Sequence, residues 1–164
     1  TWDANDQVVV GDNNPDAQGS VGLNVAYKGF YLNASFMYQW GAQSYNETLL
    51  NKVENADVRG SNVDRRVLTQ RWMKPGDIAP FYDMGNQTKT QVTTRFVQDY
   101  DYFNFSGFSL GYDFSRELIS KWRLRSLGLR FNMNDICRWS TVKEERGTSY
   151  PFSRSFSFTL NIGI

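Results

Sequence analysis

The end of the chain alternates between hydrophobic and polar residues. Residues 153–164 read S-R-S-F-S-F-T-L-N-I-G-I, and from Phe156 onward every second residue is hydrophobic. Because successive side chains of a strand point to opposite faces, this strand has one apolar face and one small, polar face. A strand that crosses the hydrocarbon of a bilayer shows this pattern over roughly 9–11 residues. A half-buried strand of a soluble β-sandwich alternates in the same way, so this segment alone leaves both alternatives open.

The same alternation predicts a hairpin near the amino terminus. Residues 20–27 and residues 30–41 each carry their hydrophobic side chains at every second position. Lys28-Gly29 between them is a two-residue connection, and its glycine tolerates a positive φ. These segments therefore predict two long antiparallel strands joined by a tight turn.

Two further strands are predicted at residues 102–114 and 122–133, joined by a short connection with one helical turn at 115–121. In the first, Phe103 and Phe105 have the opposite parity to Phe108 and Leu110. One extra residue reverses the phase of a strand, so we expect a β-bulge near Ser106 and Gly107. The second also changes phase, after Leu124.

Residues 42–101 lack the two-residue period and are rich in Asn, Gln, Asp, Arg and Thr. Within them, residues 49–58 have the pattern of a short helix. A connection of this length is unusual in a compact soluble domain. Long loops on one side of a sheet and tight turns on the other are normal in outer-membrane barrels.

The five predicted strands thus alternate between short and long connections. This arrangement should place aromatic side chains near both ends of the strands, as membrane interfaces favour. We therefore predict an all-β fold, a segment of an antiparallel transmembrane β-barrel with long extracellular loops. The expected aromatic residues are Tyr27, Phe30, Tyr112, Phe114 and Trp122, with Ile164, at the short-turn rim and Trp40, Phe105, Phe131 and Phe152 at the other.

Composition narrows the possible functions. The mean hydropathy is −0.54 and no long apolar run occurs, which excludes transmembrane helices but not strands. With 18 Lys and Arg against 17 Asp and Glu, the net charge of +1 gives no reason to expect a nucleic-acid partner. The chain has no histidine, so catalytic triads and zinc sites are poor hypotheses, and Cys137 has no partner for a disulfide.

The sequence contains carboxylate pairs and one Asp- and Asn-rich turn that could in principle form sites. The carboxylate pairs Asp99/Asp101 and Glu144/Glu145 have no accompanying base or nucleophile, so we expect solvated charge and no enzyme, cofactor or metal site. Asp12, Asn14 and Asp16 have the spacing of a calcium loop but lack its later Gly and Glu. An Asx turn is the expected structure there.

Several phrases resemble one family when taken together and in order. They are D-R-R-V-L-T-Q-R-W at 64–72, K-P-G-D at 74–77, T-R-F-V-Q-D at 94–99, F-S-L-G-Y at 108–112 and Y-P-F-S-R at 150–154. This series is similar to the C-terminal end of the SusC-like TonB-dependent transporters of Bacteroidetes outer membranes. Two departures occur: Met133-Asn134-Asp135 stands where the family usually has a small residue, a polar residue and Asn, and the last residue is Ile rather than Phe.

The resemblance implies a 22-stranded barrel with a plugged lumen, of which these would be the last five strands. It implies a location in the bacterial outer membrane and import of oligosaccharides or peptides. The implied partners are a SusD-like surface lipoprotein, outer-membrane lipid, the remainder of the barrel and its plug, and TonB acting on that plug.

Five strands cannot close a barrel, because the smallest membrane barrels have about 8. In lipid, each unpaired backbone group at an open edge costs several kcal/mol. Thr1 does not begin a signal peptide either. We therefore expect a piece of a larger protein, whose remaining strands pair with residues 20–27 and 153–164.

The long loop supplies the candidate substrate-binding residues. Aromatic rings stack on sugars and peptides, and Arg side chains form forked hydrogen bonds. The alternative is that these residues fold the loop on itself or onto the lipoprotein. A soluble carbohydrate-binding β-sandwich is the alternative for the whole chain, and it would need no detergent. The candidates are Trp72, Phe81, Tyr82, Arg65, Arg66 and Arg71.

Overall fold

The computed structural model describes residues 3–86, 88–143, 146, 150 and 152–164, and it divides the chain into two compact units. The sheet unit comprises Asp16–Trp40, Asp101–Ser140 and Ser153–Ile164. The loop unit comprises Thr1–Pro15, Gly41–Tyr100 and Thr141–Phe152. Glu144 and Glu145 of the second carboxylate pair, and Pro151 of the Y-P-F-S-R phrase, lie outside the described residues.

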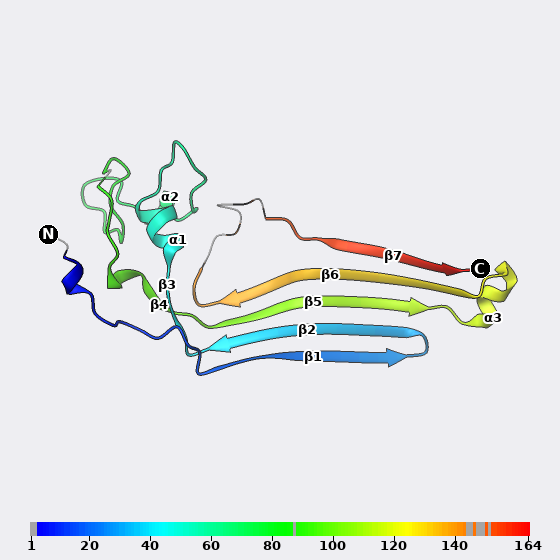
Figure 1. Cartoon of the computed structure of the whole chain (residues 1–164). Helices are drawn as coiled ribbons and strands as arrows, with labels where there is room; N and C mark the ends of the chain where they lie inside the picture. The colour runs from blue at the N-terminus through cyan, green and yellow to red at the C-terminus, as the bar shows by residue number, and fades with distance from the viewer. Residues whose placement is uncertain (1–2, 87, 144–145, 147–149, 151) are drawn as a thin grey trace. The chain divides into compact units, whose positions relative to one another are not determined.

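The sheet unit contains one antiparallel sheet of five strands in the order β1-β2-β5-β6-β7 (Figure 1). Each strand pairs with the neighbour expected from simple up-and-down connections. The prediction of an all-β, antiparallel fold is therefore confirmed. The strands are β1 (Ala17–Tyr27), β2 (Phe30–Trp40), β5 (Tyr102–Asp113), β6 (Ser126–Ser140) and β7 (Phe156–Gly163).

The fourth strand differs from its predicted bounds of 122–133. The chain after β5 forms the short helix α3 (Arg116–Ile119) and a 3-10 turn, η4 (Ser120–Trp122). Arg123 then adopts a left-handed conformation with φ 56°, which interrupts the extended backbone that a regular strand needs. Trp122 therefore belongs to the connection, and β6 begins after it and continues to Ser140.

The predicted bulge lies where the parity of the sequence changes. Ser35 of β2 faces Gly107 and Phe36 faces Phe105, so Ser106 is the extra residue on β5. On β6 the register moves from Asn134 to Cys137 across the same point, past Asp135 with φ 51°. At this point β5 has one more residue than β2, and β6 has one more than β5. Because each strand resumes its pairing after the bulge, the hydrophobic side chains of all three strands stay on the same face of the sheet.

One face of the sheet is consequently apolar from edge to edge. Residues paired across all five strands repeat the pattern, as in the row Val25, Leu32, Leu110, Phe131 and Phe158. Ring contacts tie neighbouring strands together on this apolar face, with centroids 4.7 Å apart for Phe36 and Phe105 and 4.9 Å for Phe131 and Phe158. The opposite, polar face carries amides and hydroxyls, as in the row Asn24, Asn33, Ser109, Asn132 and Ser157.

Aromatic side chains gather at both ends of the apolar face, although one predicted position, that of Phe131, is wrong. At the end with the Lys28-Gly29 turn, here called the turn end, Tyr27, Phe30 and Tyr112 form one row. At the other end, the loop end, Tyr38, Phe103 and Trp139 form another. Phe131, expected at the loop end, pairs with Leu110 nearer the turn end because β6 is longer than predicted. Phe152 belongs to the loop unit.

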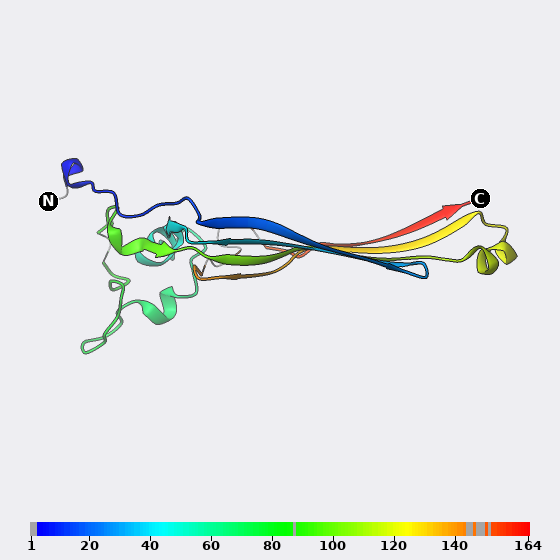
Figure 2. The ribbon, with the colours of Figure 1, turned by 90° about the horizontal axis from the view of Figure 1, so that it is seen from below.

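The sheet is a single layer with two open edges. Figure 2 shows the strands edge-on as one thin, twisted band. β1 and β7 each pair with one neighbour only. Half of their backbone N–H and C=O groups are therefore left facing outward.

The loop unit is built from short elements around a small core. Asn46, which is buried, caps the first helical turn by accepting a hydrogen bond from the Leu49 amide at 3.0 Å. The helical stretch runs from Glu47 to Glu54, earlier than the predicted 49–58. The elements are η1 (Ala4–Asp6), β3 (Gln43–Tyr45), α1 (Glu47–Leu49), the π-helical η2 (Leu50–Glu54), α2 (Val67–Gln70), η3 (Thr94–Phe96) and β4 (Val97–Asp99), with β3 paired to β4.

No helix among the described residues is long and apolar enough to span a membrane. The expected Asx turn is present, since the Asn14 amide donates to the Asp12 carboxylate at 2.9 Å.

Candidate functional site

The core of the loop unit includes one of the predicted site residues. Leu49, Leu50, Val53, Val67 and Phe96 pack with Phe81 into a buried cluster. Phe81 is almost fully covered, so its ring serves the folding of the loop unit. An aromatic residue in this position has no face left for stacking on a ligand.

Arg71 is a second predicted site residue that the loop unit buries. Only 4% of the surface of Arg71 is exposed. The guanidinium donates hydrogen bonds to the carbonyl oxygens of Val53 at 3.2 Å, Tyr82 at 2.9 Å and Asp83 at 2.7 Å. Two segments distant in sequence, at residue 53 and at residues 82–83, are thereby fixed to one cation, as the fork of five donors on an Arg side chain permits.

Arg66 is engaged in a comparable way. Its Nε donates to Asp64 Oδ1 at 2.8 Å and its Nη2 lies 2.6 Å from Asp64 Oδ2, a bidentate ion pair with a buried carboxylate. The same Nη2 donates to the carbonyl oxygen of Lys143 at 2.7 Å. A paired and hydrogen-bonded Arg of this kind positions the backbone around it.

The remaining three predicted residues keep exposed surface. Tyr82 and Arg65 are exposed, and Trp72 is half-buried, with its backbone amide bonded to the Phe81 carbonyl oxygen at 3.1 Å. The structure thus divides the six candidates into Phe81, Arg66 and Arg71, which hold the loop unit together, and Trp72, Tyr82 and Arg65, which reach its surface. Contact of any of them with a substrate stays a prediction.

Sequence reasoning missed the ion pair between the buried carboxylate of Glu54 and Arg95, whose side chain is 44% exposed. Arg95 Nη2 lies 2.7 Å from Glu54 Oε2, and Thr90 Oγ1 donates to Glu54 Oε1 at 2.9 Å. The Arg95 guanidinium also stacks 4.8 Å from the centroid of Phe96. The two partners of the ion pair are far apart in sequence, and the T-R-F-V-Q-D phrase that contains Arg95 does not point to Glu54.

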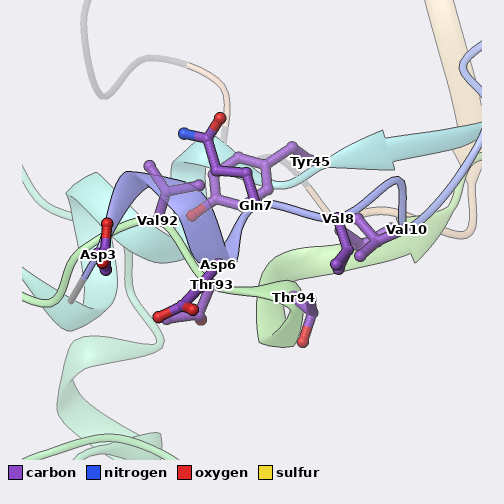
Figure 3. Close-up of a pocket in the computed structure, with 10 residues that line it drawn as sticks. Asp3, Asp6, Gln7, Val8, Val10, Tyr45, Val92, Thr93 and Thr94 are labelled. Carbon is purple, nitrogen blue, oxygen red and sulfur yellow. The ribbon is translucent and has the colours of Figure 1, made fainter. Parts of the chain in front are cut away.

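In the loop unit, a hollow of about 500 Å³ lies between the amino-terminal segment and β3 and β4 (Figure 3). The hydroxyl of Tyr45 is buried there and has no hydrogen-bond partner among the described residues. None of the six predicted residues lines this hollow. Its lining is Asp3, Asp6, Gln7, Val8, Val10, Tyr45, Val92, Thr93, Thr94 and Val97.

The chemistry available in this hollow is hydrogen bonding and apolar contact. Carboxylates, hydroxyls and valine side chains offer a mixed surface for part of a polar ligand. Among the described residues no group of three or more His, Cys, Asp or Glu side chains is placed to hold a metal ion.

The apolar face of the sheet is the most extensive surface feature of the chain. Its side chains are uncovered, with Phe158 at 76% exposure and Leu160 at 57%. Ala34 is the only hydrophobic strand residue of the sheet that is buried among those described. Contiguous apolar patches beyond a few hundred Å² are rare on soluble monomers and mark sites of contact with protein or membrane. The uncovered residues are Val21, Leu23, Val25, Tyr27, Phe30, Trp40, Phe103, Leu110, Leu129, Trp139, Phe156, Phe158, Leu160 and Ile162.

The polar face carries ordered side-chain pairs. Arg130 Nε donates to the Tyr31 hydroxyl at 2.9 Å while its guanidinium lies 5.1 Å from the centre of the same ring. The Tyr31 ring lies across Gly111, where a Cβ would overlap it. Ser109 Oγ donates to Asn132 Oδ1 at 2.8 Å on the neighbouring pair of strands. These contacts make the polar face a fixed, hydrogen-bonding surface.

The sequence matches no protein-family model and no curated protein. Two solved structures of the RagAB peptide importer match the fold. The "open-open" state matches with a TM-score of 0.68 and 15% sequence identity, and the "closed-closed" state with 0.64 and 16%. The matches cover 100% and 99% of this chain and 19% of each matched chain. The chain therefore spans about a fifth of the matched chains, and the likeness shows its fold.

Proposed function

We propose that this chain is five adjacent wall strands and an extracellular loop unit of an outer-membrane, TonB-dependent importer of oligosaccharides or peptides. In this proposal the five strands close a 22-stranded barrel together with strands outside the chain. The plug, through which TonB acts, also lies outside it, and a SusD-like lipoprotein covers the extracellular side. The chain itself supplies wall and loops and no catalysis.

The observation that carries this proposal is the uncovered apolar face. Fourteen large hydrophobic residues on one face of a single-layer sheet are exposed to solvent in this chain. At about 25 cal/mol per Å² of apolar surface, leaving such a face in water is strongly unfavourable. A bilayer covers a face of this kind without any second protein layer, and it favours the aromatic rows found at both ends of the strands.

The two open edges support the same proposal. β1 and β7 both present unpaired backbone groups, and a sheet in lipid must satisfy these groups by closing on itself. Both edges therefore require further strands of the same barrel. The resemblance of the sequence to the last part of SusC-like transporters implies such strands, in parts of the barrel outside this chain.

The alternative, a soluble carbohydrate-binding β-sandwich, requires a second sheet packed on the apolar face. Side chains in the interior of a sandwich are buried between two sheets about 10 Å apart. In this chain Val21, Phe158 and Ile162 are all exposed, and the other sheet of the described residues has two strands of three residues each. The alternative is therefore the weaker one.

Import is the function best supported for the whole protein. The two matched structures belong to an importer of peptides, and the resemblance of the sequence motifs implies import independently. Peptides and oligosaccharides both suit a loop unit with exposed Tyr82 and Trp72, since aromatic faces pack on either. Arg65, which is also exposed, would add hydrogen bonds to a carbonyl or carboxylate.

Adjacent residues on β7 test the membrane part of the proposal. Leu160 lies on the apolar face and Asn161 on the polar face, and both are exposed in the isolated chain. In the full-length protein, Leu160→Arg should cost about 2–4 kcal/mol and reduce the amount assembled in the outer membrane, whereas Asn161→Arg should assemble nearly as the wild type does. Ile162→Arg should behave as Leu160→Arg does. Equal assembly of the Leu160 and Asn161 variants would contradict a lipid-facing role.

Import itself is tested by uptake of labelled oligopeptides and labelled oligosaccharides into cells that carry or lack the full-length gene. We expect uptake of one class that requires the gene and TonB, and co-purification of a surface lipoprotein in detergent. A protein that is soluble without detergent and purifies alone would overturn the proposal.

A further inference from the structure

The connection between β5 and β6, residues 114–125, concentrates positive charge. It contains Arg116, Lys121, Arg123 and Arg125 and one acidic residue, Glu117, which gives it a net charge of +3 in a chain whose net charge is +1. The rest of the chain is therefore slightly acidic. A local excess of this kind at one end of a sheet indicates an anionic partner.

The connection is held firmly against the sheet. Ile119 is almost completely buried, and its carbonyl oxygen accepts the Leu124 amide at 3.4 Å. The Arg125 amide donates to the carbonyl oxygen of Gly163 on β7 at 2.7 Å, and the Phe114 amide to that of Leu127 at 3.0 Å. The charged side chains thus project from an ordered backbone.

The tip of the connection combines cations with uncovered apolar side chains. Trp122, between Lys121 and Arg123 in sequence, is 64% exposed, and Leu118 is 54% exposed. Among the described residues, no acidic side chain forms an ion pair with any of the four cations of the connection. Arg116 and Arg125, with Ser120 and Leu124, line a hollow of about 490 Å³.

Aromatic residues of the sheet lie at this same end. Figure 1 shows α3, the β1–β2 turn and the carboxyl terminus together at the turn end. The exposed rings of Tyr27 and Phe30 lie on the apolar face there, and Lys28 Nζ is 5.3 Å from the Tyr27 ring centre. Aromatic, Lys and Arg side chains are enriched at the level of the lipid headgroups. The rings tolerate partial hydration there, and the cations reach the phosphate groups.

We infer that the β5–β6 connection binds the phosphate groups of phospholipids in the leaflet that faces the turn end. The inference rests on the proposed function, in which short turns face the periplasm and the apolar face meets acyl chains. Lys121 and Arg123 reach phosphate oxygens, and Trp122 and Leu118 enter the region of glycerol and upper acyl chain. Arg116 and Arg125 hold a second phosphate at the hollow between them. Anionic phospholipid is therefore retained next to the transporter.

Arg123 allows a variant that removes charge without disturbing the fold. Its left-handed φ of 56° is a conformation that glycine adopts without strain. Arg123→Gly combined with Lys121→Gln therefore keeps the turn and removes two cations. The matched control is Arg59→Gln with Lys74→Gln, two exposed cations of the loop unit.

The experiment uses the full-length transporter with its lipoprotein, extracted from bilayers of phosphatidylethanolamine and phosphatidylglycerol. Native mass spectrometry then measures the phosphatidylglycerol retained. A cation near an anionic surface contributes about fivefold in affinity, so the Lys121/Arg123 double variant should bind phosphatidylglycerol roughly thirtyfold more weakly than wild type, and the control should equal wild type. Retention equal to wild type in the double variant would overturn the inference, as would crosslinking of Trp122 to a protein segment in place of lipid.

Assembly of each variant in the outer membrane is measured in the same samples. Normal assembly with unchanged lipid retention refutes the inference and leaves the proposed function standing. Failure of the wild-type protein to partition into bilayers refutes the proposed function itself.

Discussion

At the scale of single residues, the loop unit depends on cations that are used internally. Arg71 is buried and bonded to three carbonyl oxygens, none of which has a charge of its own. A buried charge contributes to stability when its donors are satisfied, and its removal leaves the acceptors without partners. Arg71 therefore connects η2 with residues 82 and 83.

Replacing Arg71 tests this connection. Arg71→Met keeps the stem of the side chain and removes every donor, so the loop unit should lose about 3 kcal/mol of local stability. Hydrogen–deuterium exchange of the full-length protein should then speed up at residues 47–54 and 81–83. Lys74→Met, at an exposed position, is the control and should leave these amides protected. Unchanged protection in the Arg71 variant would show that the three hydrogen bonds do not hold the loop unit.

Glycines on the polar face differ in what surrounds them. Gly111 lies beneath the Tyr31 ring, so a Cβ there would overlap the ring and displace it from Arg130. Gly22, on the same face of β1, has no atom within 4 Å of the position where a Cβ would stand. The first glycine is required by close contact, and the second is not.

Alanine substitutions at Gly111 and Gly22 should therefore differ clearly in their effect on stability. Gly111→Ala should destabilise the folded barrel by about 1–3 kcal/mol through overpacking. Gly22→Ala should be neutral or slightly stabilising, since alanine has less conformational freedom to lose in the unfolded chain. The midpoint of heat-induced unfolding in detergent compares them. Equal midpoints would mean that the Tyr31 ring moves aside freely.

At the scale of elements, the bulge at Ser106 decides which residues face which side. Phe103 and Phe105 lie on the apolar face only because one extra residue separates them from Phe108. Ser106 Oγ also donates to the Ser35 carbonyl oxygen at 3.0 Å, which fixes the bulge to β2. A strand without the extra residue would turn one of its halves over.

Deleting Ser106 should therefore impair assembly of the full-length protein in the outer membrane. Either the two phenylalanines move to the polar face or residues 107–113 do the reverse, and both outcomes put polar groups toward lipid. Deletion of Ser61, in an exposed part of the loop unit, is the control and should assemble normally. Trypsin resistance of the assembled barrel reports the difference. Full resistance after deletion of Ser106 would contradict the register.

The strands and the bulge were predictable because their signal lies in neighbouring residues. Alternation identifies β1, β2, β5 and β7, and a reversal of parity identifies the extra residue of β5. The start of β6 was not predictable, because Trp122 and Leu124 alternate correctly while the backbone of Arg123 is left-handed. The end of β6 was missed because Asn134 and Asp135 have the composition of a loop.

The interior of the loop unit was beyond sequence reasoning for a different reason. The acceptors of Arg71 are backbone carbonyl groups, which every residue has, and Glu54 finds Arg95 through the fold alone. Phe81, Arg66 and Arg71 were predicted as site residues because aromatic rings and guanidinium groups bind ligands. The same groups also make the contacts that hold the loop unit together. Composition does not distinguish an Arg that binds a ligand from one that binds the chain.

At the scale of the whole molecule, the proposed function depends on which surrounding covers the apolar face. In the proposed function, further strands pair with the two open edges of the sheet unit and lipid covers the fourteen exposed hydrophobic residues on one side. The fold of this chain is similar to that of about a fifth of each matched chain. If the wall faces lipid, every second residue of β7 must contact lipid and the residues between them must face away from it.

Site-directed spin labelling of β7 tests that demand most directly. Each position from Phe156 to Gly163 is replaced singly by Cys in a cysteine-free, full-length transporter in bilayers, with Cys137→Ser in this chain, and its accessibility to oxygen and to a water-soluble nickel complex is measured. Lipid around the apolar face predicts an oxygen-to-nickel ratio that alternates with every residue, high at Phe156, Phe158, Leu160 and Ile162. A ratio that stays constant along the strand, or is high at the odd-numbered positions, would contradict a membrane-facing wall.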